Sequence, residues 1–159
     1  MGRLRRREII PEDTPIVATI NDPKIVHGQF GRQVQAQTRV IEGEYRGTEF
    51  RTWFSFGKDN ESGEEFIPHG GALYQVLSLV APDLDEFLSS DESLNEKKYQ
   101  AYIKKAVAQL AGVKIMARVG VKTSKANPEK KNNVLQPGTI GPFEDPDEAI
   151  DAAMAEAPF

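Results

Sequence analysis

The chain contains no cysteine, one tryptophan and two histidines among its 159 residues. Without cysteine it can have neither a disulfide framework nor a thiolate metal site. The histidines, His27 and His69, have no partner at the spacing of metal ligands, so a structural role is expected for each. No apolar run approaches the roughly 20 residues that span a membrane, so we expect no membrane partner.

Sequence motifs of catalysis are also missing. Gly70 and Gly71 lack the Lys and the Ser or Thr of a phosphate-binding loop, and no dinucleotide-binding glycine pattern follows a predicted strand. No serine stands in a nucleophile elbow, and the acidic residues fall in predicted loops and in the C-terminal segment. We therefore expect a non-catalytic protein that uses no metal and no cofactor.

Charge is unevenly distributed, although the formal net charge is only −4. Residues 144–159 hold six acidic residues and no basic one, which leaves 20 Lys and Arg against 18 Asp and Glu, a net of +2, in the other 143. The N-terminus carries an arginine cluster without the apolar segment of a secretory signal, and a cytoplasmic location is expected. We predict a flexible basic arm over residues 1–14, a domain over 15–143 and an acidic tail over 144–159.

Two stretches alternate with period two, at residues 33–40 and 49–56, which is typical of half-buried strands. Their predicted inward residues are Val34, Ala36, Thr38, Val40, Phe50, Thr52, Phe54 and Phe56. Their predicted outward residues are Gln33, Gln35, Gln37, Arg39, Glu49, Arg51, Trp53 and Ser55. An outward face of glutamines, arginines and tryptophan suits the stacking and hydrogen bonding of nucleobases. The alternative is that Trp53 closes the open end of a barrel.

The remaining elements follow from periodicity and from breakers. Residues 15–26 are predicted to form a strand that bends near Pro23, because proline cannot donate to a central ladder. Helices are predicted from residue 72 to Pro82, over a short turn at 84–88, and over 93–111 up to Gly112. A strand is predicted over 113–123 and a last strand over 134–140, separated by a lysine-rich loop.

This order predicts a mainly β protein with an α-helical insertion between the third and fourth of five strands, which matches the OB-fold. An OB-fold binds oligonucleotides on strands 2 and 3 and with the loops that join strands 1–2 and 4–5. The predicted nucleic-acid-binding residues from these three places are Phe30, Arg32, Gln33, Gln35, Gln37, Arg39, Arg51, Trp53, Lys122, Lys125, Lys130 and Lys131.

The segments FGRQVQAQTRVIEG and GVKIMARVGVKTSKANPEKKNNV, with the helix-rich segment between them, resemble OB-fold single-stranded DNA-binding proteins of bacteriophages and related bacterial elements. The resemblance covers about residues 14–140. It implies that the protein binds single-stranded DNA, without catalysis, in DNA replication, recombination or repair in the cytoplasm of a bacterial host.

The C-terminal sequence EDPDEAIDAAMAEAPF adds to this resemblance. Bacterial and several phage single-strand-binding proteins end in an acidic segment with a hydrophobic tip, often Pro-Phe. The resemblance therefore implies that Pro158 and Phe159 bind replication or recombination proteins. The main alternative is a phage-type structural or interaction β-barrel with Trp53 and Phe30 in a protein interface, and a small nuclease comes third. Oligomeric state, homo-oligomers included, stays open.

Overall fold

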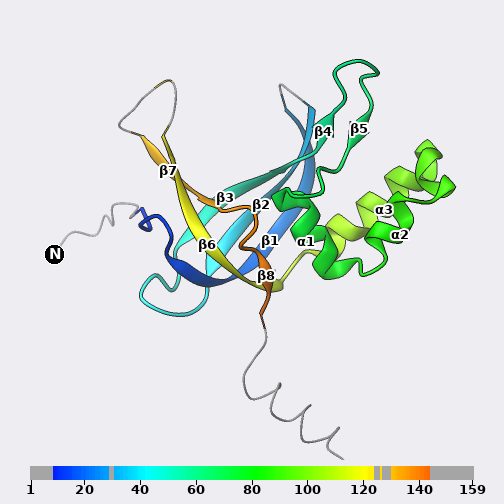
Figure 1. Cartoon of the computed structure of the whole chain (residues 1–159). Coiled ribbons are helices and arrows are strands. Elements are labelled where there is room, and N and C mark those ends of the chain that lie inside the picture. The colour runs from blue at the N-terminus through cyan, green and yellow to red at the C-terminus, as the bar shows by residue number, and fades with distance from the viewer. Residues whose placement is uncertain (1–8, 29–30, 124–125, 127–129, 144–159) are drawn as a thin grey trace, which may run out of the picture.

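The computed structural model describes residues 9–28, 31–123, 126 and 130–143 (Figure 1). The predictions made for residues 1–8, Phe30, Lys125 and the tail with Pro158 and Phe159 lie outside the described residues.

The described part is mainly β, as predicted, and consists of a strongly curled antiparallel sheet with helices on one side (Figure 1). Its strands are β1 (Pro15–Gly28), β2 (Gly31–Val40), β3 (Glu49–Ser55), β6 (Val113–Thr123), β7 (Lys131–Leu135) and β8 (Gly141–Pro142). They are ordered β3-β2-β1-β6-β7, and β8 also pairs with β6. Strands β1, β2 and β3 follow one another as hairpins, and β6 returns beside β1, which is the Greek-key order. The two outermost strands, β3 and β7, contact each other, so the sheet curls into a half-barrel.

The connection from β3 to β6 holds the small hairpin of β4 (Gly57–Lys58) and β5 (Glu65–Phe66) and all the helices of the described residues. These are α1 (Ala72–Val80), α2 (Leu84–Leu88), the 3-10 helix η1 (Asp91–Leu94) and α3 (Glu96–Gln109). Helix α1 ends before Pro82, as predicted. The Asn95 side chain caps α3 by accepting from the Lys98 amide at 3.1 Å. Beyond α3 the chain reverses at Gly112, whose φ of +80° favours glycine.

The core lies between the inner face of the curled sheet and the helices. Val34, Ala36, Phe50 and Phe54 are almost completely buried, so the predicted inward faces of the hairpin are confirmed. The inward hydroxyls of Thr38 and Thr52 also lie in the core, where they pair with each other at 3.1 Å. The helices cover this face with Leu73, Val76, Leu77, Ile103, Val107 and Leu110.

The C-terminal part of the sheet differs from the predicted single strand over 134–140. Strand β7 is Lys131–Leu135, and β8 follows only after a turn at Gly138, whose φ is +85°. Pro137 cannot donate to a ladder, which explains why pairing breaks there. Lys131 consequently stands in a strand and not in the loop.

Asn133 of β7 also holds the N-terminal segment. Its side chain accepts from the Ile10 amide at 2.9 Å and donates to the Ile10 carbonyl at 2.8 Å, and Ile10 is completely buried. The folded body thus includes Ile10, ahead of β1.

Candidate nucleic-acid interface

The outward face of β1, β2 and β3 aligns polar and aromatic side chains in cross-strand rows. The strand registers place Lys24, Gln35 and Trp53 in one row, Asn21, Gln37 and Arg51 in the next, and Thr19, Arg39 and Glu49 in the third. Directly opposed residues have Cβ atoms about 5 Å apart, so each row forms a continuous strip across the strands. Of the predicted residues, the structure brings Gln35, Gln37, Arg39, Arg51 and Trp53 together on one surface.

Trp53 presents its ring to solvent from β3, the outermost strand of this surface. Its side chain is 47% exposed, whereas its chain neighbours Thr52 and Phe54 are 3% and 1% exposed. The contrast follows from the pleat, which points successive side chains to opposite faces. Trp53 therefore does not close the barrel interior, and its indole is accessible to a flat ring.

Lys24 joins the Trp53 row because of a β-bulge. Asn21 pairs with Gln37 and Lys24 pairs with Gln35, so β1 covers three residues where β2 covers two. One residue of β1 is therefore unpaired. The extra residue reverses the inside–outside alternation from there on. Asp22 in the bulge has a φ of +49°, and Pro23 follows it. Sequence reasoning predicted the bend at Pro23 but not its consequence for Lys24.

Positive charge prevails on this surface. Arg39 and Glu49 approach to 3.8 Å, but both side chains are more than half exposed, so the pair is weak. Arg51 forms no ion pair within the described part of the chain. At one end of the face, Arg39 and Arg46 line a shallow recess of about 470 Å³ with Thr19 and Asn21. Sequence reasoning did not single out Arg46, which lies in the connector between β2 and β3.

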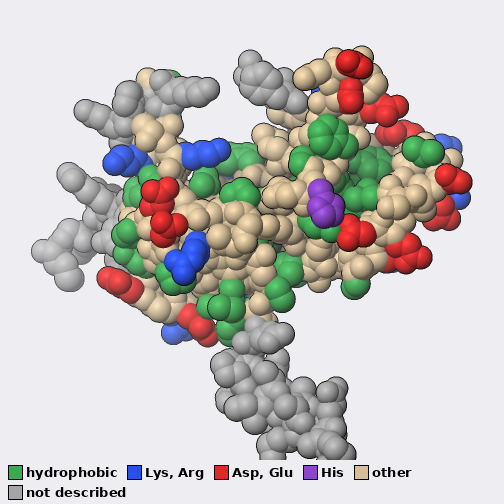
Figure 2. All heavy atoms as spheres, in the orientation of Figure 1, with side chains coloured by type: hydrophobic (Ala, Val, Ile, Leu, Met, Phe, Trp, Pro, Cys, Tyr) green, Lys and Arg blue, Asp and Glu red, His purple; other side chains and the backbone are tan. Residues whose placement is uncertain are grey.

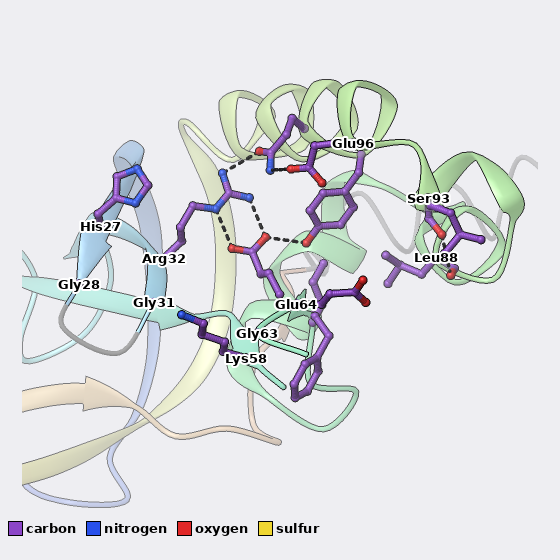
Figure 3. A pocket seen from close by; sticks show the side chains of 17 residues that line it. His27, Gly28, Gly31, Arg32, Lys58, Gly63, Glu64, Leu88, Ser93 and Glu96 are labelled. Atoms are coloured by element: carbon purple, nitrogen blue, oxygen red, sulfur yellow. Dashed lines mark hydrogen bonds and ion pairs between the residues drawn. The ribbon is translucent and has the colours of Figure 1, made fainter. Parts of the chain in front are cut away.

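Arg32, also predicted to bind nucleic acid, faces the opposite side of the hairpin. Its Nε donates to Glu65 Oε1 at 2.6 Å and its Nη2 to Glu65 Oε2 at 2.7 Å, while Nη1 donates to Gln100 at 2.7 Å (Figure 3). The guanidinium also lies over the Phe56 ring at 5.0 Å. The Glu65 hydrogen bonds hold the pKa of Arg32 above its ordinary value. Arg32 stands two residues before the inward Val34, so the alternation of β2 could have predicted that Arg32 also faces inward.

The Arg32–Glu65 pair lies in a cleft of about 750 Å³ between the β1–β2 turn, the β4–β5 hairpin and α3 (Figure 3). The Tyr99 hydroxyl donates to Glu65 Oε2 at 2.8 Å. Burial, together with this hydrogen bond, raises the pKa of Tyr99, so the phenol stays a donor. Phe66 and Leu94 line the same cleft and are 49% and 83% exposed.

The basic end of the β6–β7 hairpin carries the predicted lysines that the structure describes. Lys122, Lys130 and Lys131 are exposed there, with Lys122 opposite Asn132 across the ladder. This hairpin and the β1–β2 hairpin project from the same side of the molecule (Figure 1). Basic side chains gather near the β6–β7 hairpin, whereas acidic ones gather over the β4–β5 hairpin and the helices (Figure 2).

The described residues offer neither a metal site nor a membrane-spanning helix. No cluster of three or more His, Asp or Glu side chains in them has the arrangement of a metal site. None of their helices combines the length and the apolar character needed to cross a membrane. Comparison of the chain with protein-family models, with curated proteins and with solved structures finds no match.

Proposed function

We propose that this protein binds single-stranded DNA on the outward face of β1, β2 and β3. The observation that carries the proposal is the half-exposed Trp53, which stands on the edge strand β3 of that face in one row with Gln35 and Lys24. A tryptophan beside amide and cationic side chains offers stacking, hydrogen bonds to base edges and a phosphate contact within one strip.

The architecture supports the same function. A curled Greek-key sheet whose outer strands meet, with helices between β3 and β6, agrees with an OB-fold. In that fold β2 and β3 would form the binding platform, the β1–β2 turn would be one flanking loop, and the β6–β7 connection would be the other. Gln35, Gln37, Arg39, Arg51 and Trp53 occur on β2 and β3, and Lys122, Lys130 and Lys131 occur at the described ends of the β6–β7 connection.

Binding would combine two physical terms. Stacking on an aromatic ring is worth about 1–3 kcal/mol per base and tolerates any base. Cations that contact phosphates release counterions and add affinity that does not depend on sequence. Lys24, Arg39, Arg51, Lys122 and Lys130 are exposed and available for such contacts. Arg32, by contrast, would act by holding the β1–β2 turn against α3.

The biological role follows from this chemistry and from the resemblance of the sequence to phage single-strand-binding proteins. A non-catalytic protein that covers single strands would serve DNA replication, recombination or repair in the cytoplasm of a bacterial host. The acidic tail would recruit partner proteins through Pro158 and Phe159.

Tryptophan fluorescence tests the proposal directly, because Trp53 is the only tryptophan in the chain. A short single-stranded oligonucleotide should quench the emission in a saturable manner. If four cations contact phosphates, the slope of log K against log salt is near −3, and affinity falls about 50-fold between about 50 and 200 mM salt.

Two variants make this test specific. Trp53→Phe keeps an aromatic face and should retain most of the affinity in a mobility-shift assay, whereas Trp53→Ala should lose about 1–3 kcal/mol. Absence of any mobility shift and of any quenching at low salt would refute the proposal.

A protein-interaction barrel is the second candidate function, and a specific observation favours it. Phe66, Leu94 and Met116 are large apolar side chains with roughly half or more of their surface exposed, and none belongs to the proposed DNA-binding face. In such a barrel Trp53 would be one more residue of a protein interface. The second candidate would be favoured if the protein bound no oligonucleotide at low salt and instead self-associated or bound a partner protein through Trp53.

A further inference from the structure

The solvent-facing side of α3 is a strip of lysines and alanines. Lys97, Lys98, Lys104 and Lys105 are all exposed, and the two lysine pairs stand seven residues apart, which brings them to the same side of the helix. Ala101 and Ala108, which are also exposed, stand three residues after the first and the second lysine pair and therefore lie on the same side of the helix. We call these six residues the α3 lysine strip. The opposite side of α3 packs into the core through Tyr99, Ile103, Ala106 and Val107.

Little within the described residues compensates this charge. Lys98 approaches Glu92 at 3.8 Å, and both side chains are more than half exposed, so the pair contributes little. Glu96, the one acid of α3, accepts a hydrogen bond from Gln100 on the side of the Arg32–Glu65 cleft. For Lys97, Lys104 and Lys105, no ion pair with a described residue is present. The strip is therefore a local cationic surface, on a helical side whose other charged side chains are acidic (Figure 2), that the proposed DNA-binding face does not include.

The acidic tail leaves the folded body near the C-terminal end of this helix. Strand β6 begins at Val113, a few residues after α3 ends at Gln109, and Ile115 of β6 pairs with Pro142 of β8. The Phe143 ring lies 6.0 Å from Lys114 Nζ. Phe143, the last described residue before the segment 144–159, thus lies beside the first residues of β6, which follow α3 in the chain.

The segment 144–159 matches the α3 lysine strip in charge and in length. Residues 144–159 contain six carboxylates and no base, and the strip presents four ammonium groups. At 1.5 Å per residue the 14 residues of α3 extend about 21 Å, a length that about seven residues of extended chain cover. The tail is long enough to follow the strip from its C-terminal end to Lys97.

From these observations we infer that the α3 lysine strip is the docking surface for the acidic segment 144–159 of the same chain. The inference is independent of the proposed DNA binding, because it assigns a different face and a different occupant. Its consequence is that the tail rests on the helical side, away from Trp53, when no partner protein is bound.

Paramagnetic broadening in the full-length chain tests the inference without any nucleic acid. The absence of native cysteine allows a single spin label at Ala155→Cys. At about 0.1 M salt, where the screening length is about 10 Å, the amide signals of Ala101, Lys104 and Ala108 should lose most of their intensity. At about 1 M salt, where it is about 3 Å, the signals should recover, because the contact is electrostatic.

Two charge-matched variants supply the control. The triple variant Lys97→Gln, Lys104→Gln and Lys105→Gln should abolish the broadening of α3. The triple variant Lys24→Gln, Lys58→Gln and Lys131→Gln removes the same charge elsewhere and should preserve it.

Three results would overturn the inference. The first is broadening of the Gln35 and Trp53 signals in place of those of α3, which would put the tail on the DNA-binding face. The second is broadening of α3 that appears equally when spin-labelled protein is mixed with isotope-labelled protein that lacks the spin label, which would assign the tail to a second copy. The third is no broadening of the described residues at either salt concentration.

Discussion

Each face of the β2–β3 hairpin carries an arginine and an aromatic ring, but those of the inner face are enclosed and those of the outer face are exposed. On the inner side, Arg32 is held by Glu65 and Gln100 with 17% of its side chain exposed, and Phe54 is buried. On the outer side, Arg51 is exposed and unpaired among the described residues, and Trp53 is half exposed. Strand parity alone separates a structural residue from one that is available to a ligand.

The largest expected difference between the two faces concerns the aromatic neighbours Phe54 and Trp53. Phe54→Ala leaves a cavity in the core and should lower the free energy of unfolding by about 3–5 kcal/mol. Trp53→Ala should change stability by less than about 1 kcal/mol while weakening oligonucleotide binding by about 1–3 kcal/mol. Urea unfolding and mobility shifts measure the two effects. A large loss of stability in Trp53→Ala with unchanged affinity would show that the faces have been assigned the wrong roles.

The second difference concerns the glutamates that pair with arginine on each face. Glu65→Ala leaves the mostly enclosed Arg32 guanidinium without its bidentate partner and should cost about 2–3 kcal/mol of stability. Glu49→Ala removes the exposed partner of Arg39 and should cost less than about 0.5 kcal/mol. The measurement is urea unfolding of both variants at neutral pH. Equal losses of unfolding free energy in the two variants would mean that enclosing Arg32 does not strengthen its pairing with Glu65.

The lysines at the end of the β6–β7 hairpin provide a third test, now of binding. Replacing Lys125, Lys130 and Lys131 together should weaken binding to all sequences alike, because phosphate contacts carry no base information. The slope of log K against log salt should become less steep by about 0.7 for each phosphate that the variant no longer neutralises. Titrations of variant and parent at several salt concentrations give this slope. Parallel plots of log K against log salt for variant and parent would show that the β6–β7 hairpin does not contact the DNA.

The smallest expected effect belongs to Lys24, which reaches the outer face only through the bulge. Lys24→Gln should leave stability unchanged and reduce the salt slope by about 0.7, the value of one neutralised phosphate. Lys58→Gln, at the cleft on the helical side, is the matched control and should leave the slope unchanged. Indistinguishable slopes for the two variants would remove Lys24 from the binding face.

Much of the hairpin and of the helices was predictable from sequence, because the relevant signals are local. The alternation of Val34, Ala36, Phe50 and Phe54 with polar residues specifies which face is buried, and the structure confirms it. Pro82 and Gly112 likewise mark the ends of helices through their own backbone restrictions. Whether the outer face binds DNA remains a prediction.

Tertiary structure decided the features that depend on partners far apart in the chain. Arg32 finds Glu65 and Gln100 across separations of 33 and 68 residues, and Asn133 holds Ile10 across 123. The exposure of Lys24 depends on a register shift against β2, which only the paired strands reveal. Alternation and chain breakers are properties of neighbouring residues, and the sequence alone therefore determined the buried face of the β2–β3 hairpin and the ends of the helices at Pro82 and Gly112. Pairing and register depend on which segments meet in space, and only the folded chain determined which partners enclose Arg32 and that Lys24 reaches the outer face.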